Sequence, residues 1–180
     1  MAQTKKDYGD LIFQYADNAT GDVSAEDLRD LVESLYPSYG ECYLTATAAT
    51  TIGFPSTKAA VIDGNNYYKA AGTTTAGLLS RFTMPADNKL LYTGTPTILA
   101  HVAVSVSFST ATGSRVMGLK LAQGGSVIDK TFVTRKTSTT PGDIGACSIQ
   151  AILTLATSEY VELFIANETD ASNATVRAMS

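Results

Sequence analysis

The chain has 180 residues, 44% of them hydrophobic and only 17% charged, and its formal net charge is −4. This length suits one domain with a full-sized core, and the low charge content leaves a surface rich in Thr, Ser, Ala and Gly. The scattered Lys and Arg residues exclude nucleic-acid binding through a clustered basic patch. No apolar run reaches the roughly 18 residues needed to span a membrane. No apolar segment follows Met1–Lys6, so we expect no signal peptide and synthesis in a cytoplasm.

The first forty residues carry two runs of apolar side chains with helical spacing. One run is Tyr8, Leu11, Ile12 and Tyr15, and the other is Leu28, Leu31, Val32 and Leu35. Turn residues separate the runs at 17–23, Ser24 is placed to cap the second helix, and Pro37 ends it. We therefore predict a small N-terminal helical hairpin over residues 1–40. Such a hairpin buries little surface by itself, so its apolar stripes need the rest of the chain, a sister subunit or a partner.

From about residue 41 the hydrophobic period changes to two. Alternating segments occupy 98–108, 115–123, 147–156, 160–167 and 174–180, and the turn clusters between them lie at 109–114, 123–125, 137–143 and 157–159. Further turn clusters lie at 85–88 and 93–96. Many short strands without interleaved helices indicate an antiparallel sandwich or barrel. We assign residues 41–180 to this second domain.

The side chains that carry enzyme chemistry are few and scattered. His101, the only histidine, lies in mid-strand opposite Val102 and Val104, so it is expected to face solvent or a neighbouring subunit. The carboxylates Glu159, Glu162 and Glu168 flank one hairpin and are expected to be solvated strand charges. Cys42 and Cys147 are expected to be buried thiols, although their pairing stays open, and the turn at 16–27 lacks the first ligand of a calcium loop. We predict no catalytic site, no cofactor and no metal.

The C-terminal third resembles a known family of jelly rolls. Between residues 147 and 180, the segment LTLATSEYVELFIANETDASNATV resembles the penultimate hairpin and final strand of tumour necrosis factor and of complement-component globular heads. Ser158–Glu159 stands where that family often has Gly-Asp. Family members usually continue for several apolar residues after the last strand begins, whereas this sequence ends at Ser180, so the final strand is expected to be either short or truncated. The segment SRFTMPADNKLLYTGTPTILAHVAVSVSF resembles the early strands. The resemblance covers about 41–180 and implies an all-β jelly-roll sandwich that assembles as a homotrimer.

The N-terminal segment YADNATGDVSAEDLRDLVESLYP resembles a helical stretch that precedes such jelly rolls in phage virion proteins. Together the two resemblances imply a capsid decoration or cement protein, made in the bacterial host cytoplasm, located in the virion and bound to the major capsid protein of a phage. The alternative is a receptor-binding domain of a head or tail fibre. We expect the capsid-binding anchors to include Leu11, Ile12, Tyr15, Leu28, Leu31, Val32 and Leu35. We expect the trimer interface to include His101, Ala103, Tyr160 and Phe164.

Overall fold

The structure is a computed structural model that describes residues 35–53, 67–70 and 72–180. The helical hairpin predicted over residues 1–40 lies outside these ranges, apart from its last few residues. Within them the chain is β-rich, and short single-turn 3₁₀ segments, η1 (Ala46–Ala48) and η3 (Asp129–Thr131), join some of the strands. The expected all-β class is thereby confirmed for the residues that the structure describes.

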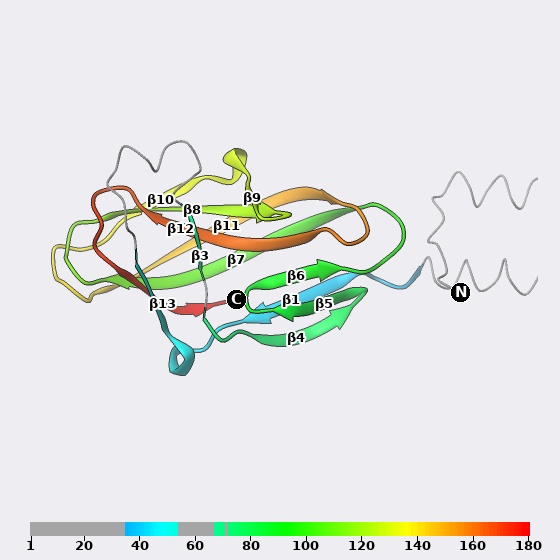
Figure 1. The fold of residues 1–180 in the computed structure, drawn as a ribbon, viewed down its shortest axis with the longest axis horizontal. Helices are drawn as coiled ribbons and strands as arrows, with labels where there is room; N and C mark the ends of the chain where they lie inside the picture. Colours follow the sequence, from blue (N-terminus) through cyan, green and yellow to red (C-terminus); the bar gives the residue numbers. More distant parts are fainter. Residues whose placement is uncertain (1–34, 54–66, 71) are drawn as a thin grey trace, which may run out of the picture.

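The strands form two packed sheets and a small two-stranded ribbon (Figure 1). One sheet has the order β11 (Ile144–Leu155), β7 (Ile98–Thr110), β13 (Ala174–Met179) and β2 (Thr50–Ile52). The other has the order β10 (Val133–Lys136), β8 (Val116–Gln123), β12 (Tyr160–Asn167), β6 (Lys89–Tyr92) and β5 (Phe82–Ala86), with β3 (Tyr68–Lys69) on β12 and β9 (Ser126–Val127) on β8. The ribbon pairs β1 (Tyr39–Tyr43) with β4 (Thr75–Ser80).

The strand order is that of a jelly roll. Strand β2 pairs with β13, β6 with β12, β7 with β11 and β8 with β10, so the pairs are nested from the ends of the chain towards its middle. This nesting is what results when a long antiparallel hairpin of eight strands wraps into two sheets. The connectivity itself therefore makes the fold a jelly-roll sandwich.

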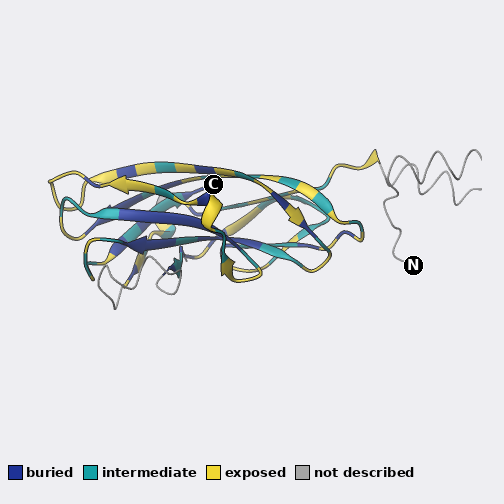
Figure 2. Ribbon diagram, turned by 90° about the horizontal axis from the view of Figure 1, so that it is seen from above, coloured by how far each residue is buried: buried dark blue, intermediate teal, exposed yellow. Residues whose placement is uncertain are grey.

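The alternation read from the sequence locates the main strands within a few residues. The predicted segments at 98–108, 115–123, 147–156, 160–167 and 174–180 correspond to β7, β8, β11, β12 and β13. Along most of β7 and β11, inward positions alternate with more exposed ones, whereas β8 and β12 are covered on both faces over most of their length (Figure 2). The inward side chains of β8, Met117, Leu119 and Leu121, are fully buried against the opposite sheet. Each such burial contributes about 1.5–3 kcal/mol, which makes the space between the sheets the core of the fold.

Asn88 acts as a short substitute for strand pairing inside the larger sheet. Strand β6 pairs with the start of β12 and β3 with its end, which leaves an interval around Leu163. The Asn88 side chain, only 3% exposed, fills this interval. Its Nδ2 donates to the carbonyls of Leu163 (2.9 Å) and Ala70 (3.1 Å), and its Oδ1 accepts from the Leu163 amide (3.2 Å). One amide side chain thus completes the pairing of β12.

Candidate functional site

The outward side chains of the sheet formed by β11, β7, β13 and β2 make a surface that we call the low-charge face. Strand alternation places the following residues on it: Ile144, Ala146, Ser148, Gln150, Ile152 and Thr154 of β11; Leu99, His101, Ala103, Ser105, Ser107 and Ser109 of β7; Thr175 and Arg177 of β13; and Thr51 of β2. Among these described positions Arg177 is the only residue with a formal charge at pH 7. A sheet face with so little charge is unusual for a surface in contact with water.

Large apolar side chains project from the low-charge face. Leu99 is 77% exposed, Ile152 is 62% exposed and Ile144 is 58% exposed. The register pairs Ile152 with His101 and Thr154 with Leu99, so Leu99 and Ile152 are close diagonal neighbours at the same end of the β7–β11 pair. Diagonal positions on adjacent strands are within reach of each other, so these two side chains form one exposed apolar area.

The polar side chains of the low-charge face are short and bond to one another. Ser105 and Ser148 are 3.2 Å apart across β7 and β11, and Thr51 and Thr175 are 3.0 Å apart across β2 and β13. These hydroxyl groups lose little conformational freedom when they are covered, and their mutual hydrogen bonds lower the cost of removing them from water. The face can therefore be buried at small cost.

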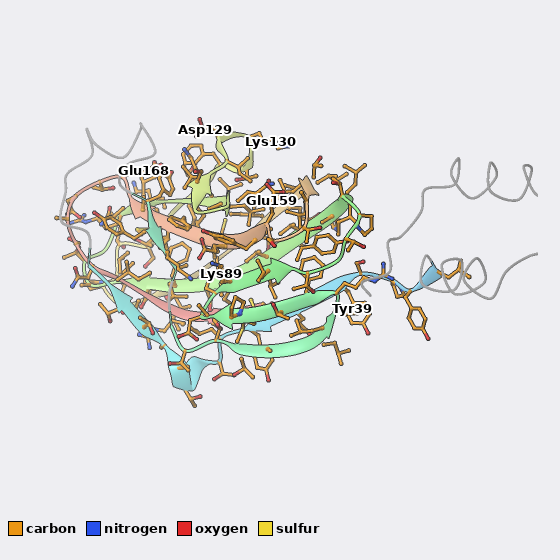
Figure 3. The ribbon with its side chains drawn as sticks, turned by 45° about the vertical axis from the view of Figure 1, so that its right-hand side comes forward. Tyr39, Lys89, Asp129, Lys130, Glu159 and Glu168 are labelled. Atoms are coloured by element: carbon orange, nitrogen blue, oxygen red, sulfur yellow. The ribbon has the colours of Figure 1, made fainter. Side chains whose placement is uncertain are left out.

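The outer face of the opposite sheet has a different chemistry. Lys120 pairs with Asp129 at 2.7 Å and lies 4.7 Å from the centre of the Tyr67 ring, and Lys89 lies 3.5 Å from the centre of the Tyr160 ring. Burial, together with the nearby Glu168 carboxylate, raises the pKa of Tyr67 above its usual range. Figure 3 shows Lys89 at the start of β6, Asp129 in η3 and Glu168 just after β12. Lys120, Asp129 and Lys89 thus have partners within the chain.

The structure divides the four predicted interface residues between the two sheets. His101 and Ala103 lie together on the low-charge face, two residues apart on β7, and both are exposed. Tyr160 and Phe164 lie on the outward side of β12 in the other sheet, where Tyr160 contacts Lys89 and Phe164 packs near Tyr67. One flat interface cannot include all four. The sequence reasoning did not single out Leu99, Ile144 and Ile152, although the alternation that places His101 outward also places Leu99 outward.

Of the predicted capsid-binding anchors, only Leu35 falls among the described residues. Its side chain is 75% exposed, as an anchor that binds a separate partner requires. The other anchors, Leu11, Ile12, Tyr15, Leu28, Leu31 and Val32, lie outside the described residues. The segment that carries Leu35 leaves the sandwich at one end, ahead of β1 (Figure 1).

The acidic side chains near the β11–β12 hairpin serve the fold. Glu162 was expected to be a solvated strand charge, and this expectation is wrong: it is only 8% exposed and pairs with Lys69 at 2.8 Å. Strand β3 lies beside β12 and brings the lysine to it, which the sequence pattern did not reveal. Glu159 accepts a hydrogen bond from the Ala156 amide at 2.7 Å and so closes the turn.

In the part of the chain that the structure describes, no group of three or more His, Cys, Asp or Glu side chains is placed to hold a metal ion. Cys42 on β1 and Cys147 on β11 are both free and half-buried. Burial raises the pKa of the Cys42 thiol. Among the described helical segments, none has the length and hydropathy of a membrane span.

A loop at one end of the sandwich is held by Asp170. Its carboxylate pairs with Nε of Arg115 at 2.8 Å and accepts hydrogen bonds from the Asn167 side chain and the Ser172 amide. Burial opposes the charge of Asp170, but the hydrogen bonds and the Arg115 charge outweigh it and lower the pKa of this carboxyl group. The loop between β12 and β13 is therefore stabilised by a negative charge.

Comparison with known proteins gives structural likeness without sequence likeness. No family model matches the sequence, and no curated protein matches it. The tumour necrosis factor Eiger from S. frugiperda is similar in structure with 8% identity and a TM-score of 0.47, and the match covers 79% of this chain and 93% of Eiger. Murine APRIL has 8% identity and a TM-score of 0.40 over 72% of this chain and 98% of its own.

A family 35 carbohydrate-binding module from an environmental isolate is also similar, with 10% identity and a TM-score of 0.33 over 51% of this chain and 63% of the module. The assignment of the fold as a jelly roll rests on the strand order.

Proposed function

We propose that this chain is a non-enzymatic virion protein that assembles as a homotrimer through its low-charge face and decorates a phage head by binding the major capsid protein. The observation that carries the proposal is the low-charge face itself, with Leu99 and Ile152 exposed on a surface that has one formal charge among its described positions. The location on a phage head rests on the resemblance of the N-terminal segment to those of virion proteins.

Self-association is supported by the composition of this face. The cores of subunit interfaces are poor in charged side chains, because each buried charge must be desolvated and paired. A face made of Ser, Thr, Ala, Leu and Ile has almost no charged side chains that would have to be desolvated and paired. A monomer with the same face would leave Leu99, Ile144 and Ile152 in water, whereas a second copy would cover them.

The attachment role follows from joining this trimer to the N-terminal segment. Leu35 lies where the chain leaves one end of the sandwich, so a trimer with its axis along the sandwich would present three such segments at the same end. Three weak apolar contacts on one scaffold bind a repeating capsid surface far more tightly than each would alone. A structural role is further supported by the partners of Glu162 and Glu159, which hold the fold and leave no pair of free carboxylates in the described part of that hairpin.

The test is native mass spectrometry of the full chain at micromolar concentration. We expect a mass three times the 18.9 kDa of one chain. The variant Ala103→Glu should dissociate the trimer, because an uncompensated charge buried in each subunit costs roughly 3–5 kcal/mol. The matched control is Thr134→Glu, which places the same side chain at an exposed strand position on the other sheet and should leave the mass unchanged.

A wild-type monomer, or a trimer that survives Ala103→Glu, would overturn the assembly proposal. Attachment is tested separately by adding the protein to phage heads that lack it and imaging the particles. Many regularly spaced copies would support decoration, whereas a few copies at a single vertex or on the tail would support the alternative of a fibre domain.

A further inference from the structure

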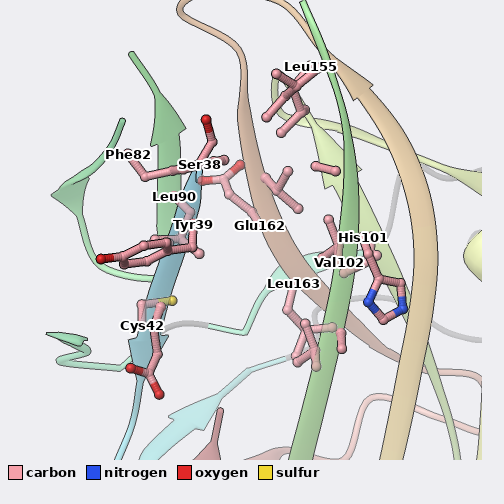
Figure 4. Close-up of a pocket in the computed structure, with 18 of the residues that line it drawn as sticks. Ser38, Tyr39, Cys42, Phe82, Leu90, His101, Val102, Leu155, Glu162 and Leu163 are labelled. Carbon is pink, nitrogen blue, oxygen red and sulfur yellow. The ribbon is translucent and has the colours of Figure 1, made fainter. Parts of the chain in front are cut away.

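Arg177 is the one formally charged residue among the described positions of the low-charge face. That face is the outer side of its sheet: in Figure 4, Val102 and His101 leave β7 in opposite directions, Val102 towards Leu163 and His101 outward. The Arg177 side chain is half-buried on β13, and its Nε donates to Oγ of Ser109 on β7 at 3.2 Å. No described carboxylate lies within ion-pair distance of the guanidinium group. One hydroxyl group satisfies only one of its donors, so the positive charge stays without a counter-charge in the described chain.

A subunit interface that covers the low-charge face has to supply the missing anion. Burying an unpaired charge is strongly unfavourable, whereas a carboxylate on the opposing surface offsets the loss of water and fixes how the two surfaces align. The inference rests on the proposed function, in which a second copy of the chain covers this face. The anion must then be one of the chain's own carboxylates.

Asp143 is the described carboxylate that is free to serve. At the end of the sandwich where β13 begins, the described carboxylates are Asp143, Glu168 and Asp170. Asp170 is paired with Arg115, and Glu168 lies on the outer side of the other sheet. Asp143 is exposed, and its side chain accepts a hydrogen bond only from the Ile144 amide, at 2.9 Å. That bond uses one carboxylate oxygen and leaves the other available for an ion pair.

Arg177 and Asp143 lie in one row of the sheet, near its opposite margins. Ile144 pairs with Ser109 across β11 and β7, and Ser109 is the residue that Arg177 contacts. Asp143 directly precedes Ile144, whose amide points away from β7, so its carboxylate lies at the outer edge of β11. Strand β2 pairs with β13 only up to Val176, which leaves Arg177 near the other margin. Because β7 separates β11 from β13, the Cα atoms of Arg177 and Asp143 are roughly 10 Å apart, two strand spacings, within one subunit.

A threefold axis along the strands brings these two margins together. Strands β7 and β11 run along the long direction of the sandwich (Figure 1). Rotation about an axis in that direction does not change the height of a residue along it, so residues of one row meet residues of the same row. In a closed ring, one margin of each face meets the opposite margin of the next, and such contacts join different residues of the two subunits. Arg177 and Asp143 satisfy both conditions.

We propose that Arg177 of each subunit pairs with Asp143 of the next subunit, so that three identical ion pairs close the trimer. The pair gives the single charge of the low-charge face a counter-charge that is not available within one subunit. It also sets the register of the subunits, because the apolar and hydroxyl groups of the face would tolerate sliding. A ring of such pairs favours a second copy of this chain over an unrelated apolar surface.

Charge reversal tests the pairing in the full chain. Sedimentation equilibrium at pH 7 measures the subunit concentration at which half of the protein is trimeric. Arg177→Glu and Asp143→Arg should each raise this concentration at least tenfold, because like charges then face each other. The double variant restores the pair in reverse and should return to within threefold of the wild type. Lys136→Glu makes the same change of charge on the outer side of the other sheet and should have no effect.

Rescue by the double variant separates an interaction from damage to the fold. Defects that each substitution causes inside its own subunit add up in the double variant, whereas a restored contact cancels the two losses. Circular dichroism should show the same strand content for all variants.

A disulfide tests the same contact independently of charge. Cysteines whose Cα atoms are more than about 7 Å apart cannot be joined without backbone movement, and β7 separates positions 143 and 177 within one subunit. Oxidation of the double variant Arg177→Cys and Asp143→Cys should therefore link different subunits and give covalent dimers and trimers in non-reducing electrophoresis. Each single variant, which retains Cys42 and Cys147, is the control and should run as one chain.

Two results would contradict the pairing and leave the trimer standing. One is a double reversal that assembles no better than the weaker single variant. The other is a double cysteine variant that forms no interchain disulfide while the wild type is trimeric. A wild-type monomer is a different result, because it contradicts the proposed assembly itself and this pairing with it.

Discussion

The side chain of Asn88 offers a direct test of how the larger sheet is held together. Replacing it by alanine removes three hydrogen bonds to the main chain of β12 and to Ala70. The Leu163 carbonyl keeps a partner, because the Ala70 amide also donates to it at 2.8 Å. The Leu163 amide and the Ala70 carbonyl are left without one, in a region where both residues are almost fully buried.

The expected loss of stability follows from these two buried groups, which lose their hydrogen-bond partner. Each buried, unsatisfied polar group costs about 1–3 kcal/mol, so Asn88→Ala should lower the free energy of unfolding by roughly 2–6 kcal/mol. The φ angle of Asn88 is +50°, a conformation that asparagine tolerates better than alanine, and this adds about 1 kcal/mol. A total of about 3–7 kcal/mol is a large part of the ~5–15 kcal/mol that stabilises a typical domain.

Urea denaturation followed by circular dichroism measures this loss. Asn88→Gly separates the two effects, because glycine accepts the positive φ angle but makes no hydrogen bond, and should be about 1 kcal/mol less harmful than alanine. Asn173→Ala, at an exposed position, is the control and should stay within about 0.5 kcal/mol of the wild type. A loss below about 1 kcal/mol for Asn88→Ala would refute the view that this side chain replaces a strand.

Two further predictions concern charge and attachment. The pKa of Asp170 is lowered in the folded protein, so the stability that its charge contributes is complete above the unfolded pKa of about 3.9 and is lost as the pH falls through the folded pKa. The Tm difference between wild type and Asp170→Asn should therefore be clear at pH 7 and shrink below about pH 4. A Tm difference that stays constant over this range would contradict the prediction. The double variant Leu31→Asp and Leu35→Asp should release the protein from phage particles in a sedimentation assay while leaving the trimer intact; loss of the trimer would mean that these residues are not the anchors.

The main strands and their inward residues could be predicted because a strand has a period of two. In the segment ILAHVAVSVSF, the alternation placed Val102 and Val104 inward and His101 outward, and the structure agrees. Strand β12 was predicted with the bounds it has, since a three-residue turn and a long loop delimit it. Local pattern is sufficient for such features, because backbone geometry alone decides which side of a strand a residue occupies.

The fate of the outward residues could not be predicted in the same way. Glu162 and Phe164 alternate outward just as His101 does, yet Glu162 is buried beside Lys69 and Phe164 lies near Tyr67, whereas His101 is exposed. The difference comes from β3, which lies far from β12 in sequence but pairs beside it and brings the side chains of Lys69 and the preceding Tyr67 to its outer face. The local sequence pattern around residue 162 does not indicate that β3 will lie beside it.

By itself, then, the sequence determined the class of the fold, the positions of its long strands and the low content of charged residues that leaves one sheet face almost uncharged. Only the tertiary structure decided that His101 and Ala103 share that face while Tyr160 and Phe164 do not, and that Asn88 completes a sheet. The physical reason is that alternation is a property of a single strand, whereas the faces and edges of a sheet depend on which strands become neighbours. Contacts between residues far apart in the chain determine which strands those are.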